Sequence, residues 1–272
     1  MRLPNRALIH LTGPDTLSLL ERTVTHSVTD WETGALRYGA LLTPQGKVIA
    51  DYLVLRTEDG VIVDVHEEAA DDLMKRLKMF RLRAAVEIER DERLATVILG
   101  DGHRDPRSTR LPGRDYVPVS QAAEAMSAAE WQAMRIAAGV PEWGADYRAA
   151  EVFPTDINMD VMGGVDYKKG CFVGQEVASR MKRRGKIRKR TLPVLGGGLA
   201  TGAPLLAGTE VGTLTSVDAG NGRGLALVRT DRLQKALDQS LPVTCEGEPV
   251  RIDLPDWAEA EMMALAAEGT DE

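Results

Sequence analysis

The stretch ALRYGALLTPQGKVIADYLVLRTEDGVIVDVH, residues 35–66, decides the fold of the N-terminal half of this 272-residue chain. It contains three runs rich in apolar and β-branched residues, separated by TPQG and TEDG, and these two links carry typical turn residues. Links this short join antiparallel strands, because a parallel pair needs a crossover of a dozen or more residues. The stretch therefore predicts a three-stranded antiparallel meander.

The segments on both sides extend this region. GPDTLSLLERTV, residues 13–24, predicts a helix that Asp15 can cap, and EEAADDLMKRLKMFR, residues 67–81, predicts an amphipathic helix with its acids first and its bases last. Two further strand-like runs follow, AAVEIER and LATVILG. Strands, helix and strands in this order predict an α+β fold with an antiparallel sheet, and the polar run 101–118 predicts a connecting loop.

The second half of the sequence contains a well-marked helix followed by short β-rich runs. Ser127 and Glu130 form a capping box, and Gly139 marks the end of the best-defined helix. After residue 190 short β-rich runs alternate with Gly-rich turns, which predicts a small barrel or sandwich. We therefore place a domain boundary near Thr191, with a first region over 1–190 and a C-terminal β-domain with a short terminal helix over 191–272.

Composition indicates an ordinary globular protein with an uneven charge. The net charge is −7, yet residues 180–190 carry +8 with no acid, which leaves −15 (−7 − 8) on the remainder. The start lacks the pattern of a signal peptide, and no run approaches the about 18 apolar residues of a membrane span. We therefore expect a cytoplasmic protein without a membrane partner. The two cysteines form neither a disulfide framework nor a zinc-ligand set, so no metal is expected.

Cys171 is the first candidate for chemistry. A thiol is a good nucleophile or metal ligand only as the thiolate, which nearby cations and a helix N-terminus favour. Lys168 and Lys169 precede it, and the following GQEVASRM can begin a helix. Gly170 and Gly174 flank it and permit tight turns or close backbone approach. This pattern predicts a reactive or ligand-donating thiol.

A competing interpretation is that Cys171 is buried as a small hydrophobe beside Phe172 and Val173, because free cysteine is often buried. The chain has four histidines, and none stands at a recognisable catalytic spacing from the cysteine. Papain-like chemistry is therefore not favoured. The histidines are His10, His26, His66 and His103.

The basic run RMKRRGKIRKR, residues 180–190, is the second candidate. It is interpreted either as a solvated face whose long stems cover apolar surface, or as a site for a polyglutamate tail, phosphates, RNA or a partner protein. It contains no aromatic residue, which a single-strand-binding surface would use, so direct nucleic-acid binding is not expected. The residues assigned to this surface are Arg180, Lys182, Arg183, Arg184, Lys186 and Arg188.

The string KGCFVGQE, residues 169–176, resembles the signature of the YgfZ family, folate-binding iron-sulfur cluster assembly and repair proteins related to the aminomethyltransferase of glycine cleavage. The resemblance runs from about Leu11 to Arg229. It includes GALLTPQGKVIADYLVLR, RIAAGVPEWGADY, the region around the signature, and VGTLTSVDAGNGRGLALVR in the expected order.

The resemblance implies a cloverleaf of two interleaved antiparallel-sheet subdomains, the second roughly over 45–105, and a C-terminal β-barrel. It also implies tetrahydrofolate as cofactor and iron-sulfur client or carrier proteins as partners. The activity would be support of [4Fe-4S] proteins, including radical enzymes that modify tRNA, rather than a turnover of its own. Cys171 takes the acting role, and Lys169, Gly170, Gly174, Gln175 and Glu176 are its motif positions.

The folate pocket implied by the resemblance departs from the related aminomethyltransferases at two positions. Ala50 precedes Asp51 where those enzymes have a second carboxylate, and Ala137 stands where they have a pterin-binding Glu. Asp51 is either a folate contact or a polar position in an alternating strand, and Tyr147 and Arg148 are further candidates. Two alternatives therefore stay open, a tetrahydrofolate-dependent one-carbon transferase and a tRNA-binding module.

Overall fold

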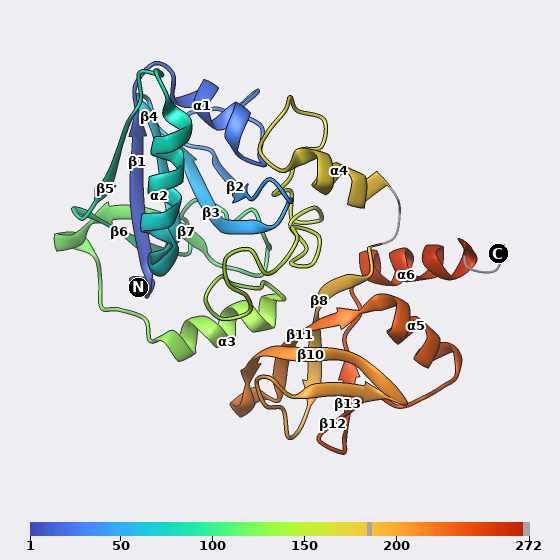
Figure 1. The fold of residues 1–272 in the computed structure, drawn as a ribbon. Coiled ribbons are helices and arrows are strands. Elements are labelled where there is room, and N and C mark those ends of the chain that lie inside the picture. The colour runs from blue at the N-terminus through green and yellow to red at the C-terminus, as the bar shows by residue number, and fades with distance from the viewer. Residues whose placement is uncertain (184–186, 269–272) are drawn as a thin grey trace. The chain divides into compact units, whose positions relative to one another are not determined.

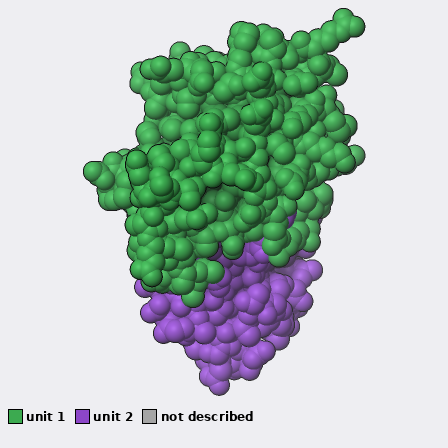
Figure 2. All heavy atoms as spheres, turned by 90° about the vertical axis from the view of Figure 1, so that its left-hand side faces the viewer, with its two compact units in different colours: residues 1–131, 148–154, 159–179 green, residues 132–147, 155–158, 180–272 purple. Residues whose placement is uncertain are grey.

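The computed structural model describes residues 1–183 and 187–268 (Figure 1). The chain divides into two compact units, coloured separately in Figure 2. The first unit contains residues 1–131, 148–154 and 159–179, and the second contains 132–147, 155–158 and the chain from 180 onward. The boundaries predicted for the subdomains stay predictions.

A five-stranded antiparallel sheet forms the centre of the first unit (Figure 1). Its middle is the expected meander, in which Ala40 pairs with Asp51 and Leu53 with Asp64. The strand that starts the chain lies between β4 and β5, and the sequence patterns did not single it out. In spatial order the strands are β2 (Leu36–Leu42), β3 (Val48–Arg56), β4 (Gly60–His66), β1 (Arg6–Thr12) and β5 (Glu87–Asp91).

Two helices accompany this sheet. α2 (Glu67–Arg81) has the predicted bounds, and it packs on β1, β3, β4 and β5 through buried residues such as Leu73 and Leu77. α1 (Thr16–Thr23) begins after Asp15, but the carboxylate of Asp15 makes no capping bond. It accepts the Ala85 N–H at 2.8 Å instead, so the predicted side-chain cap is wrong.

β6 (Leu94–Leu99) and β7 (Gly113–Pro118) form a separate two-stranded sheet. Two sequence predictions are therefore corrected: LATVILG does not join the main sheet, and 101–118 is not entirely a loop. Local hydropathy missed β7 because its Arg114 is buried by ion pairing rather than by apolar character. Arg114 lies 2.6 Å from Asp64 of β4 and 3.0 Å from Asp105.

Two helices, α3 and α4, each contain a boundary between the two units in the sequence. α3 (Ala128–Ala138) carries the predicted capping box, with Glu130 accepting the Ser127 N–H at 2.9 Å and Ser127 Oγ accepting the Glu130 N–H at 3.2 Å. Gly139 ends it at φ +74°, as expected for a helix terminus. α4 (Gln175–Arg183) follows the signature. Short 3₁₀ turns occupy η1 (Val119–Gln121) and η2 (Ala219–Asn221).

The second unit contains the closed six-stranded antiparallel barrel, in the order β10-β11-β8-β13-β12-β9 (Figure 1). Its interior is apolar and includes Leu192, Val194, Leu205 and Cys245. α5 (Thr230–Asp238) and α6 (Asp256–Glu268) also belong to it. The strands are β8 (Lys189–Gly196), β9 (Pro204–Ala207), β10 (Thr209–Asp218), β11 (Arg223–Arg229), β12 (Thr244–Cys245) and β13 (Glu248–Ile252).

Within the described ranges, no helix is both long and apolar enough to cross a membrane.

Candidate functional site

The signature loop begins with a turn that Asp166 holds. Asp166 Oδ1 accepts the backbone N–H groups of Lys168 at 2.8 Å and Lys169 at 3.2 Å. The Asp166 N–H itself donates to Thr25 O at 2.9 Å. An aspartate that accepts amides two and three residues ahead forms a local turn without secondary structure. Asp166 therefore fixes the path of the chain into the signature.

Lys169 anchors the loop to the end of α1. Its Nζ donates to Val24 O at 2.9 Å and His26 O at 2.6 Å and lies 3.5 Å from the Glu21 carboxylate, with the side chain 1% exposed. Val24 is the C-cap of α1 and His26 follows it, and backbone carbonyl oxygens are acceptors that a buried ammonium needs. Burial lowers the pKa of Lys169, and the Glu21 carboxylate opposes this shift. The signature lysine is thus committed to holding the loop.

Cys171 is exposed, whereas its neighbour Phe172 is buried. The Phe172 ring lies 5.5 Å from the Lys169 ammonium, in cation-π geometry. The structure therefore favours a presented thiol over the competing interpretation of a buried hydrophobe. The chain's other cysteine, Cys245, is fully buried in the barrel.

The two signature glycines have different surroundings. Gly174 has φ +79°, and a Cβ there would lie 2.4 Å from Thr43 O in the turn between β2 and β3. Only glycine meets both demands, the positive φ and the close approach. At Gly170 a Cβ would meet no atom within 4 Å, and the structure gives no reason for a glycine there.

The last two signature positions open α4. Gln175 is the first residue of the helix, and its side-chain amide donates to Lys169 O at 3.3 Å, which closes the loop on itself. Glu176 is exposed in the first turn, where an acid suits the helix dipole.

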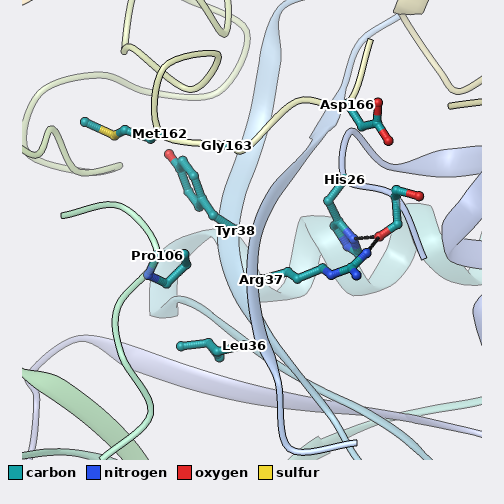
Figure 3. A pocket seen from close by; sticks show the side chains of 9 residues that line it. His26, Leu36, Arg37, Tyr38, Pro106, Met162, Gly163 and Asp166 are labelled. Atoms are coloured by element: carbon teal, nitrogen blue, oxygen red, sulfur yellow. Dashed lines mark hydrogen bonds between the residues drawn. The ribbon is translucent and has the colours of Figure 1, made fainter. Parts of the chain in front are cut away.

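A pocket of about 380 Å³ lies beside this loop in the first unit (Figure 3). Its volume is within the range of small-molecule sites. Gly163 lines the pocket at φ +71°, and a Cβ there would meet no atom within 4 Å. The lining residues are His26, Ser27, Leu36, Arg37, Tyr38, Pro106, Met162, Gly163 and Asp166.

His26 enters this pocket as a neutral ring. Burial lowers its pKa to about 3, and its Nδ1 lies 3.0 Å from Ser27 O. A carbonyl only accepts, so we assign the proton to Nδ1, which leaves Nε2 as an acceptor. Nε2 is buried and makes no hydrogen bond to the described residues.

Asp51, a sequence-predicted folate contact, lies behind the pocket rather than in its lining. Its carboxylate accepts the Tyr38 hydroxyl at 3.0 Å, and both residues are buried. Burial raises the pKa of Tyr38 well above its usual value, and the Asp51 charge raises it further. The guanidinium of Arg107 lies 5.8 Å from the Tyr38 ring. Tyr38 therefore connects Asp51 to the pocket.

The other predicted folate contacts do not line this pocket in the described structure. Tyr147 is buried in the second unit, and Arg148 is exposed in the first. Arg135, of the RIAAG stretch, is buried and donates to Asp146 at 2.6 Å and to Ser216 at 2.7 Å. These bonds join the end of α3 to strand β10.

The basic run is divided between elements. Arg180 and Lys182 are exposed on α4, and Arg188 is exposed just before β8. Arg183 ends α4, while Arg184 and Lys186 lie outside the described residues. Arg190, which closes the run, is fully buried and pairs with Glu261 of α6 at 2.8 Å, so it is not part of a surface.

Sequence reasoning missed Asp166, His26 and Tyr38 as site residues. The spacing of Asp166 to the two lysines is the one usable signal, because Asp before a polar turn is typical of this hydrogen-bonding pattern. His26 and Tyr38 carried no local signal. Among the described residues, no group of three or more His, Cys, Asp or Glu side chains is placed to hold a metal ion.

Comparison with known proteins supports this architecture. The GCVT N-terminal domain model matches residues 5–99, and the CAF17 C-terminal beta-barrel domain model matches residues 188–260. The structure is similar to the crystal structure of the glycine cleavage system aminomethyltransferase T from Bartonella henselae, with a TM-score of 0.74 and 14% identity over 92% of this chain and 83% of that chain. The chain has a GcvT-like fold with a CAF17-type C-terminal barrel, which confirms the predicted fold class.

Two curated relatives bear the name iron-sulfur cluster assembly factor IBA57 homolog, mitochondrial. The one from Coccidioides immitis is 31% identical and the one from Mycosarcoma maydis 28%, each over 71% of this chain. This chain spans 56% of the length of both. It is homologous to the IBA57 iron-sulfur cluster assembly factors. Membership of the YgfZ family is a finer assignment and stays a prediction.

The prediction of a cytoplasmic location is wrong, because the relatives are named as mitochondrial proteins. It rested on the lack of a secretory signal and of a long apolar run. Mitochondrial transit segments are amphipathic and Arg-rich instead, so neither observation separates the two destinations.

Proposed function

We propose that this protein supports the assembly or repair of [4Fe-4S] proteins and that Cys171 is the residue that meets the cluster or its carrier. The observation that carries this proposal is the exposed thiol on a loop whose flanking side chains, Lys169 and Phe172, are buried. An exposed side chain contributes little to packing, so the fold does not account for a cysteine here. Homology to proteins named as iron-sulfur cluster assembly factors supports the same role.

The chemistry of a single presented thiol suits transfer or protection rather than storage of a cluster. Iron-sulfur clusters are held by several thiolates, commonly four. Within the described ranges Cys171 has no neighbouring set of ligands, because no group of three or more His, Cys, Asp or Glu is placed for a metal. A partner would therefore supply the remaining ligands while Cys171 contributes one. Clients of this kind include radical enzymes that modify tRNA.

Reduced folate is the ligand we propose for the pocket of the first unit. The pocket offers the Tyr38 ring, the neutral His26 ring and the Asp166 carboxylate, a combination of aromatic surface and hydrogen-bond acceptors that suits a pterin. Asp51 supports Tyr38 from behind. The likeness to an aminomethyltransferase concerns the fold, and the folate proposal rests on these pocket residues.

The exposed cations Arg180, Lys182 and Arg188 are proposed to attract an acidic partner or the polyglutamate tail of folate. The rest of the chain is acidic, so this segment would be the attractive part of an otherwise repelling surface. An attraction of this kind weakens as salt screens it.

A gene-deletion strain tests the central proposal. Deletion is expected to lower the activity of [4Fe-4S] enzymes, while enzymes without clusters keep theirs. Wild-type protein and Cys171→Ala protein are then expressed to equal levels in that strain, with Cys245→Ala as the matched control because it removes the buried cysteine. We expect wild type and Cys245→Ala to restore the enzymes and Cys171→Ala not to. Full restoration by Cys171→Ala would show that the thiol has no role.

A one-carbon transferase is the second candidate, and the buried Tyr38–Asp51 pair favours it because a shielded carboxylate beside a pocket can hold or move a proton. A folate-dependent amine demethylation assay decides between the two. Turnover that disappears in Asp51→Asn would favour the transferase, whereas the accessory role predicts no turnover in either protein.

A further inference from the structure

Asp166 belongs to the pocket and to the signature loop at the same time. Its side chain lines the pocket, and its Oδ1 accepts the amides of Lys168 and Lys169. In the part of the chain that the structure describes, these two bonds are the only hydrogen bonds its side chain makes. Oδ2 is therefore available to a molecule in the pocket.

Lys169 makes a second connection between loop and pocket. Its ammonium donates to the carbonyl of His26, whose ring lines the pocket (Figure 3). The loop that presents Cys171 is thus attached to the pocket wall through Asp166 and through Lys169. A ligand that fixes this wall also restrains the loop.

The free polar groups of the pocket define the ligand. His26 Nε2 is a buried acceptor without a partner among the described residues, and the Asp166 carboxylate accepts only. Arg37 is the pocket's cation, but its Nη1 donates to Ser27 O and its Nη2 to Thr29 O and Asp30 O. The available polar groups of the pocket are therefore acceptors, and they suit a ligand that presents hydrogen-bond donors. The 2-amino group and adjacent ring N–H of a reduced pterin form such a donor edge.

We propose that Asp166 couples ligand binding to the Cys171 loop, by accepting the donor edge of a reduced pterin on Oδ2 while Oδ1 holds the amides of Lys168 and Lys169. This inference rests on the proposed binding of folate and adds its regulation. Binding stabilises the bonded form of the turn, because the carboxylate is then fixed from both sides. Occupancy of the pocket thus sets how rigidly Cys171 is presented to a partner.

Asp166→Asn separates the two functions of the carboxylate. An asparagine keeps one oxygen for the two amides, so the turn is retained. Its Nδ2 then replaces Oδ2 and meets the ligand's donors with another donor. Glu92→Gln is the matched control, because it makes the same carboxylate-to-amide change at an exposed position outside the pocket.

The experiment combines calorimetry with amide hydrogen exchange resolved to single residues, using tetrahydrofolate as the probe. In wild type and in Glu92→Gln we expect saturating ligand to slow exchange of the Lys168 and Lys169 amides by roughly tenfold, since ligand stabilises the form it binds. In Asp166→Asn we expect unchanged exchange without ligand, roughly tenfold weaker binding from loss of a charge-assisted bond, and no added protection at saturation.

An analogue of tetrahydropterin without the 2-amino group provides the second arm. It should bind wild type and Asp166→Asn with more similar affinities, because the donor that distinguishes them is gone.

The outcomes separate this inference from the folate proposal. Binding of tetrahydrofolate without a change at the two amides, or with equal affinity for wild type and Asp166→Asn, would overturn the coupling and leave folate binding intact. Absence of binding to wild type would overturn both.

Discussion

Replacing Lys169 with methionine tests whether this signature lysine holds the loop. Methionine has a similar length and an adaptable apolar stem, so the change removes the charge and little of the packing. It leaves Val24 O and His26 O without the donor that now lies 2.9 and 2.6 Å away. The variant therefore isolates the ammonium's contribution to the free energy of unfolding.

The magnitude follows from two stabilising contributions and one that opposes them. Each hydrogen bond to a charged group contributes roughly 1.5–3 kcal/mol, which gives about 3–6 kcal/mol for two. The ion pair with Glu21 adds at most about 1 kcal/mol, because the Glu21 side chain is 31% exposed and screened. Burial of the ammonium offsets part of this sum, as its lowered pKa indicates. We expect a net loss of about 2–3 kcal/mol.

Thermal unfolding followed by circular dichroism measures this loss. A destabilisation of this size corresponds to a decrease in Tm of about 4–12 °C, at about 2–4 °C per kcal/mol. Lys168→Met is the matched control, because Lys168 is exposed and its side chain should contribute less than about 0.5 kcal/mol. Equal Tm values for the two variants would refute an anchoring role for Lys169.

Three further predictions follow from single contacts. The pKa of His26 is about 3 in the folded chain and 6.5 in its ordinary state, so the unfolded chain binds more protons between these pH values. The free energy of unfolding of wild type should therefore fall by about 1.4 kcal/mol per pH unit as pH falls through this window. Urea unfolding at several pH values should show a weaker pH dependence for His26→Asn, and an equal pH dependence in both proteins would contradict the buried neutral ring. Gly174→Ala should lower the free energy of unfolding by more than about 2 kcal/mol, because of the left-handed φ and the close contact with Thr43 O. Gly170→Ala should change the free energy of unfolding by less than about 1 kcal/mol. Equal urea midpoints for the two variants would contradict this difference. Arg190→Met should cost about 3–5 kcal/mol in the same measurement because it leaves Glu261 without its buried partner, and a change below about 1 kcal/mol would show that the pair contributes little.

Much of the fold could be predicted because its decisive elements are encoded locally. The meander has β-rich runs bounded by turn residues, and α2 has helical periodicity with charges in the dipole-favoured order, so neither depends on distant residues. β7 depends on one distant partner. Arg114 is buried because Asp64, 50 residues earlier in the chain, neutralises it. A single-segment pattern contains no information about such a pair.

The site was less predictable for the same reason. Cys171 and its glycines were found from one contiguous string, but the pocket brings together His26, Tyr38 and Asp166 from three separate segments. The positive charge of Lys169 was interpreted as support for a thiolate, and the structure places that ammonium against carbonyls of residues 24 and 26. The sequence shows that Lys169 is charged but not which groups its side chain contacts, and those contacts decide the role of a buried cation.

The geometry divides the signature residues by purpose. Gly174 is required by a close backbone approach, Lys169 by the carbonyls at the end of α1, and Gln175 by its bond back to the loop. Each of these residues would be needed to build this loop even if it had no chemical task. Cys171 differs, since its side chain is exposed. These residues hold the loop in place, and the iron-sulfur chemistry that we propose depends on Cys171, whose side chain the loop leaves exposed.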